Sequence, residues 1–422
     1  MSIVALVLIA FLVVVECGLR IAGVKYDASL YRRDRDLGYT LRPNAQGWNA
    51  QEHVSYERVN SEGRRDRVHD VARPPNTIRI AIVGASYSEA KEVALDDAYW
   101  SVMERQLNRE LGPNGPRIEV INFGVAGYGL PQDYLVIRDK IWRYNPQIVI
   151  LEGTLHSIVL ETTRALAQAR AFSGPVPYFV PVDGHLVLDQ QTLEERRSFV
   201  SQGRLSLFLE DAANKSRVLS LVNNARRAAG SLLTGPWHFP WRRDNSKVSS
   251  PDFENLVLRG PVTPELTSAW QIADGLLEMC QAEANRRGAE FWFFLFDMAP
   301  QVDPDPRMRA EEQREYGIDD LFGADRLFDE FSTRQGIKHE MLAGDLFAYS
   351  SASGLLLHGF PGRPRNSGHW NVAGNRIAGH LLADKLFNCS AVIAGAIHGD
   401  PIRPSCADAL KIPNVAEEAL AR

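Results

Sequence analysis

The apolar residues of the chain fall into short runs separated by segments with helical periodicity. Three runs of four to six residues predict buried strands, at residues 78–83, 118–121 and 148–151. Apolar residues at residues 100–111 and 134–144 recur at helical spacing and predict two helices between these strands. Strand, helix, strand, helix, strand with short connections predicts right-handed crossovers and a parallel sheet.

This alternation stops after the third strand and resumes near residue 267. We expect residues 156–266 to form an inserted α+β region, in which residues 178–188 are typical of a β-hairpin around Asp183-Gly184. Beyond it, the aromatic run at residues 291–296 predicts another buried strand, and residues 372–386 predict a helix. A further segment near Leu346-Phe347 stands between them.

The N-terminus begins with an unbroken apolar run over residues 3–15. Extended to Val24, the segment reaches the ~20 residues that cross a bilayer, although it then carries Glu16 and Arg20. No small-residue cleavage site follows it, which favours a retained anchor over a removed signal peptide. The alternative is a buried first helix of the globular domain.

The expected fold class is therefore α/β, with three layers in which helices flank one parallel sheet. The chain divides into a membrane anchor (residues 1–25), an extended connector that packs on the domain (26–76), the α/β domain (77–155 and 267–390), the insertion (156–266) and a C-terminal tail (391–422).

Composition narrows the function classes. A net charge of −5 over 422 residues gives no indication of a nucleic-acid partner, and neither a metal-ligand cluster nor a cofactor motif is present in the sequence.

Cys389 and Cys406 can form a disulfide in an oxidising compartment, with unpaired thiols as the alternative. An aromatic and basic cluster can stack on a sugar or lipid, or simply pack: Trp237, Phe239, Trp241, Arg242 and Arg243.

Candidate chemistry lies where predicted strands end, because ligands of open parallel sheets bind at the carboxyl ends of the strands. Ser86 follows the first strand, Gly124 follows the second, and His156-Ser157 follows the third. His369 precedes the last helix, where it can act as a general base for a serine. Taken singly, each has an ordinary structural explanation, such as a helix cap for Ser86.

In this order the residues resemble the blocks of SGNH (GDSL-type) hydrolases, whose fold is flavodoxin-like. Gly84-Ala85-Ser86 resembles the Gly-Asp-Ser block, Gly124 the second-block glycine, and Asn366-Ser367-Gly368-His369 the Asp-x-x-His block. The likeness covers roughly residues 16–155 and 275–388, and flanks such as residues 60–66 resemble membrane-anchored bacterial members.

The resemblance implies a role for each matching residue. Ser86 would be the nucleophile and His369 the base, with Asn366 or a backbone carbonyl orienting the imidazole. The N–H groups of Ser86 and Gly124 would bind the oxyanion, with Ser157 or His156 as a third donor. The sequence departs from the family at Ala85, at Asn366 in place of the expected Asp, and at the third block, which lacks its Asn.

Two functions remain open. The first is an esterase or O-acyltransferase acting on an acylated glycan or lipid at the cell envelope. The second is a non-catalytic SGNH-like binding protein in an envelope or polysaccharide assembly, suggested by the missing Asp and Asn. A nucleotide-binding domain is disfavoured because no glycine-rich phosphate loop follows the first strand.

The resemblance also implies a single-pass inner-membrane protein with its main domain outside the cytoplasm. The basic residues that follow the apolar segment argue for the opposite orientation under the positive-inside rule: Arg20, Lys25, Arg32, Arg33 and Arg35.

Overall fold

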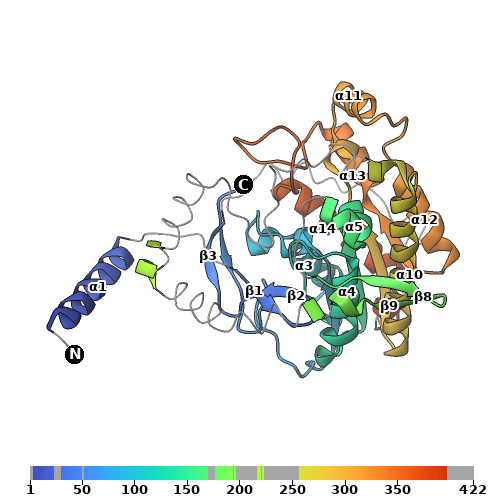
Figure 1. Cartoon of the computed structure of the whole chain (residues 1–422). Coiled ribbons are helices and arrows are strands. Elements are labelled where there is room, and N and C mark those ends of the chain that lie inside the picture. Colours follow the sequence, from blue (N-terminus) through green and yellow to red (C-terminus); the bar gives the residue numbers. More distant parts are fainter. Residues whose placement is uncertain are drawn as a thin grey trace.

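The computed structural model (Figure 1) describes residues 3–22, 30–49, 52–169, 176–192, 194–195, 216–219, 221–222 and 256–396. At its centre lies a five-stranded sheet with the order β11-β10-β7-β5-β6, in which every pairing is parallel. Its strands are β5 (Thr77–Val83), β6 (Arg117–Asn122), β7 (Ile148–Gly153), β10 (Glu290–Leu295) and β11 (Lys338–Met341). The strand order reverses between β5 and β7, which is where doubly wound sheets bind their ligands.

Helices cover both faces of this sheet, as the sequence predicts. One face packs against α4 (Leu130–Asp139), α10 (Pro264–Arg286) and α12 (Gly323–Arg334). The other packs against α3 (Tyr99–Leu111), α13 (Leu342–Ser353) and α14 (Val372–Cys389). Because successive residues of β5 point to opposite faces, both of which are covered, the strand is buried along its whole length and is mostly apolar.

The structure adds a fifth strand to the four that the sequence predicts, and it shortens one predicted helix. The fifth strand is β11, whose sequence Lys-His-Glu-Met has no apolar run because it is a half-buried edge strand. The segment near Leu346-Phe347 belongs to α13. The helix predicted at residues 134–144 ends at Asp139 and continues as the 3-10 turn η2 (Ile141–Tyr144).

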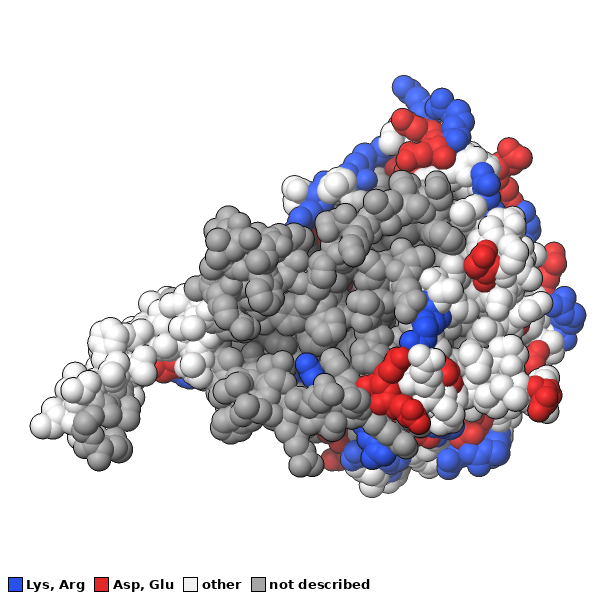
Figure 2. All heavy atoms as spheres, in the orientation of Figure 1, with Lys and Arg blue, Asp and Glu red and all other residues white. Residues whose placement is uncertain are grey.

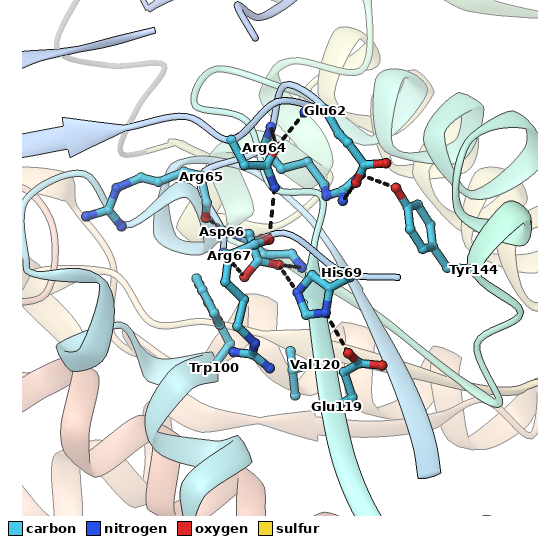
Figure 3. A network of polar contacts seen from close by, with 12 residues as sticks. Glu62, Arg64, Arg65, Asp66, Arg67, His69, Trp100, Glu119, Val120 and Tyr144 are labelled. Carbon is cyan, nitrogen blue, oxygen red and sulfur yellow. Dashed lines mark hydrogen bonds and ion pairs between the residues drawn. The ribbon is translucent and has the colours of Figure 1, made fainter. Parts of the chain in front are cut away.

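The predicted connector contains two hairpins, β1 (Tyr31–Asp34) with β2 (Gly38–Leu41) and β3 (Gln46–Asn49) with β4 (Ser55–Arg58). A buried polar network after β4 joins this segment to the sheet (Figure 3). The His69 imidazole lies between Glu119, 2.9 Å from Nδ1, and Asp66, 3.0 Å from Nε2. Asp66 also accepts a hydrogen bond from the backbone N–H of Asn122 at 2.8 Å. The connector is therefore part of the folded domain.

The predicted hairpin in the insertion is present as β8 (Phe179–Val182) and β9 (His185–Leu188), with Asp183 and Gly184 at positive φ as a two-residue hairpin turn requires. The aromatic and basic cluster at residues 237–243 lies outside the described residues. The shorter elements are α2 (Ser86–Glu89), η1 (Leu95–Asp97), η3 (His156–Leu160), α5 (Arg164–Ala169), η4 (Val257–Arg259), η5 (Ala299–Val302), α11 (Pro306–Tyr316) and α15 (Ala391–Ala396).

The N-terminal segment forms the helix α1 (Ile3–Ile21), which stands apart from the sheet in Figure 1. Most of its described apolar side chains are exposed, from Leu12 at 46% to Ile21 at 88%. In the described part of the chain, no helix meets the combined requirement of length and apolarity for crossing a bilayer, so the predicted anchor is not supported. Figure 2 shows acidic and basic side chains interspersed over the visible, described surface of the body.

Cys389 is disulfide-bonded, and its predicted partner Cys406 lies outside the described residues. Cys17 and Cys280 are free thiols.

Candidate active site

Ser86 is held in a tight turn at the end of β5. The buried Glu152 of β7 accepts hydrogen bonds from the backbone N–H groups of Ala85 at 2.6 Å and Ser88 at 3.3 Å. A Cβ atom at Gly84 would lie 2.3 Å from the Glu152 side chain, so only glycine fits there. Burial raises the pKa of Glu152 to about 7. The β5–α2 turn thus presents the Ser86 hydroxyl at the carboxyl edge of the sheet.

His369 reaches Ser86 from the loop before α14. Its Nε2 lies 2.7 Å from Ser86 Oγ, and its Nδ1 lies 2.8 Å from Glu52 Oε1. The second oxygen of Glu52 accepts the backbone N–H of His369, also at 2.8 Å. The three residues come from the β5–α2 turn, the loop before α14 and the β3–β4 turn, and form a Ser–His–Glu arrangement.

Glu52 fixes the tautomer of the imidazole. Burial raises the pKa of Glu52, but its hydrogen bonds with His369 outweigh burial and leave the pKa below its usual value. An ionised carboxylate only accepts hydrogen bonds, so Nδ1 carries the proton and Nε2 is free to accept one from the serine hydroxyl.

A second carboxylate, Glu92, lies behind the imidazole. It is 2% exposed, and its Oε1 is 3.6 Å from His369 Nδ1, beyond hydrogen-bond distance. Burial lowers the pKa of His369, but the charge of Glu92, together with the hydrogen bond and charge of Glu52, raises it above the ordinary value.

A buried hydrogen-bond network that includes Asp297, just after β10, supports the loop that carries His369. His358 contacts the backbone carbonyl of Gly368 at 2.8 Å through Nδ1, and Asp297 at 2.6 Å through Nε2. The other oxygen of Asp297 accepts the indole N–H of Trp370 at 2.8 Å. These contacts hold both neighbours of His369 in place.

The expected role of Asn366 is not supported. Its amide donates to the carbonyl of Ala299 at 2.7 Å, and its backbone has φ +49°, a left-handed conformation that asparagine tolerates. The partner of His369 Nδ1 is Glu52, so an acid is present although the fourth block lacks its Asp. Glu52 was missed because it lies 317 positions from His369 in a segment with no motif.

The predicted oxyanion donors are mostly engaged elsewhere. The N–H of Gly124 donates to the Asn122 side chain at 2.9 Å, and the Ser157 hydroxyl exchanges hydrogen bonds with the backbone of Thr154. Gly124 instead allows close packing, since a Cβ there would lie 2.3 Å from Ser88 Cβ. His156 begins η3 and makes no contact with Ser86 or His369 among the hydrogen bonds of the described residues. The Ser86 N–H has no partner within the described ranges and remains the clear donor.

Within the described residues, one group of side chains has the spacing of a metal site, namely Glu52, Glu92 and His369, whose ligand atoms all lie within 4.8 Å of one another.

Comparisons with known proteins give a distant likeness of structure. No family model and no curated protein matches the chain. Among solved structures, TesA is 10% identical over 72% of this chain and 94% of its own, with a TM-score of 0.34. The acetyl xylan esterase AlAXEase is 13% identical over 74% of this chain and 100% of its own, also with a TM-score of 0.34. Similarity at this level carries no argument about function, which has to come from the site.

Proposed function

We propose that the protein is a serine-dependent esterase or O-acyltransferase in which Ser86 is the nucleophile, His369 the general base and Glu52 the acid that orients it. The observation that carries this proposal is the continuous chain of contacts from Ser86 Oγ through the imidazole to the Glu52 carboxylate, at 2.7 and 2.8 Å. Both lengths fall within the hydrogen-bond reach that is needed between a nucleophile and its base, and between the base and the group that orients it.

The reaction follows from this geometry. Ser86 Oγ attacks the carbonyl carbon of an acyl ester while His369 Nε2 takes the hydroxyl proton, and the Ser86 N–H stabilises the oxyanion. Collapse of the tetrahedral intermediate expels the alcohol, which receives the proton from His369 and leaves an acyl-serine. Water then releases the acid, or an acceptor hydroxyl carries away the acyl group.

For the substrate we propose an acylated glycan or lipid at the cell envelope, as the family resemblance implies. The disulfide at Cys389 favours an oxidising compartment outside the cytoplasm. The exposed apolar side chains of α1 provide a surface that can attach to a membrane.

The test is covalent labelling with a fluorophosphonate, followed by mass spectrometry of the adduct. We expect one adduct, on Ser86, that disappears in Ser86→Ala and persists in Ser353→Ala, which alters an exposed serine of α13. Folded protein that remains unlabelled under conditions that label an active serine hydrolase would count decisively against the proposal.

The second candidate is a non-catalytic binding protein that retains the fold. It is favoured by the engaged N–H of Gly124 and hydroxyl of Ser157, which leave the oxyanion site with fewer donors than the family pattern requires. Unlabelled Ser86, combined with acyl-glycan binding that is unchanged in Ser86→Ala, would favour this function.

A further inference from the structure

We infer that Glu52, Glu92 and His369 form a binding site for a zinc-like divalent cation, and that occupation of this site switches off Ser86. The three side chains offer one nitrogen and two carboxylate oxygens within 4.8 Å of one another. A set of three nitrogen and oxygen ligands with an open fourth position is typical of exchangeable zinc sites.

The three side chains have to adjust their spacing to bind a tetrahedral ion. Bonds of ~2.0–2.1 Å to zinc place neighbouring tetrahedral ligands roughly 3.3 Å apart. His369 Nδ1 is 2.8 Å from Glu52 Oε1 and 3.6 Å from Glu92 Oε1, so the first contact has to open and the second has to close by a few tenths of an ångström. The two carboxylates, whose ligand atoms lie within 4.8 Å of each other, have to come to the same spacing. Glu52 is half-buried in a turn, which leaves its side chain room to move.

Glu92 provides the observation that points to a ligand. Its side chain is 2% exposed, and its Oε1, which faces the imidazole, has no hydrogen-bond partner among the described residues. A buried carboxylate oxygen without a partner is costly, and a cation between it and Glu52 would offset that cost. The positive charge of Lys91 acts on Glu52 and His369 and weakens cation binding, but two carboxylates outweigh it.

A bound cation would inhibit Ser86 by changing the tautomer of His369, and this step rests on the proposed function. In the active site the proton of neutral His369 is on Nδ1. A cation on Nδ1 displaces that proton to Nε2, where it points at Ser86 Oγ. With Nε2 acting as a donor, the imidazole has no lone pair with which to accept the serine proton, and nucleophilic attack stops.

The test measures binding and labelling separately on the full chain. Binding is measured by competition of Zn²⁺ with a chelating dye and by the visible absorption of bound Co²⁺, which reports tetrahedral coordination. We expect one ion per chain, unchanged binding in Ser86→Ala and in Glu311→Gln, an exposed glutamate of α11, and affinity at least about tenfold weaker in Glu92→Gln and Glu52→Gln. Zn²⁺ should block fluorophosphonate labelling of Ser86, EDTA should restore it, and millimolar Mg²⁺ should have no effect, because Mg²⁺ prefers octahedral oxygen ligands.

The outcomes separate the two proposals. The metal site is refuted if Zn²⁺ does not bind saturably, or if binding is the same in wild type, Glu92→Gln and Glu52→Gln. Zinc binding that both substitutions weaken, in a protein whose Ser86 is never labelled, would support the site and overturn the proposed hydrolase. Labelling of Ser86 that saturating Zn²⁺ leaves intact would overturn the switch.

Discussion

Replacing Glu52 by Gln should nearly abolish the reactivity of Ser86 while leaving the fold intact. In the wild type, one carboxylate oxygen accepts from His369 Nδ1 and the other from the His369 backbone N–H, both at 2.8 Å. A glutamine has one oxygen for these two donors. If that oxygen keeps the backbone N–H, which cannot change its role, the NH₂ group faces Nδ1 and forces it to become an acceptor.

The size of the effect follows from this switch. A proton on Nε2 prevents His369 from accepting the hydroxyl proton of Ser86, as the equivalent Asp-to-Asn change does in a serine protease, where kcat falls by about 10⁴. We expect a loss of about the same size, which corresponds to about 5 kcal/mol of transition-state stabilisation. Glu52→Ala should lose less, because water or Glu92 can then accept the Nδ1 proton.

The assay is the second-order rate constant for fluorophosphonate labelling, which requires no knowledge of the natural substrate. Ser86→Ala gives the background, and Glu311→Gln is the control for removing an exposed carboxylate elsewhere. Circular dichroism and the urea midpoint establish that each variant is folded.

Two results would refute the reasoning. One is a Glu52→Gln protein that is labelled within about tenfold of the wild-type rate. The other is a Glu52→Ala protein that is more impaired than Glu52→Gln, since that order would show that charge, not the tautomer, is the contribution of Glu52.

Three further predictions concern the surroundings of the site. His69 has a raised pKa because Asp66 and Glu119 outweigh burial, so its contribution to stability is complete below about pH 6.5 and is lost as the pH rises through the raised value; urea unfolding of wild type and His69→Gln should differ more at pH 5.5 than at pH 8.5. Asn366→Asp, which restores the family residue, should not accelerate labelling and should lower the unfolding free energy by about 1–3 kcal/mol, because the carboxylate cannot donate to Ala299. The rate of Ser86 labelling should rise with pH as His369 loses its proton. Glu92→Gln should move this rise to lower pH, because the charge of Glu92 helps to raise the pKa of His369. A rise at the same pH in both proteins would show that Glu92 does not affect the pKa of His369.

Local sequence pattern determined the central layer of the protein. The buried runs that became β5, β6, β7 and β10 are mostly apolar because helices cover both faces of the sheet, so they can be recognised without knowing their neighbours. Edge strand β11 has no such constraint and was missed. The same local logic located Ser86 and His369, because a strand end and a helix start each have recognisable residues.

Tertiary structure alone decided which groups complete the site. Glu52 lies on a hairpin turn and Glu92 on a loop, and both approach His369 in the folded domain. Their local sequences give no sign of this proximity. Asn366 and Gly124 occupy the expected positions in the sequence, but a left-handed backbone at Asn366 and the Asn122 side chain beside Gly124 direct their polar groups elsewhere. Hydrogen-bond partners depend on distances of a few tenths of an ångström between remote segments, and these are set by packing of the whole domain.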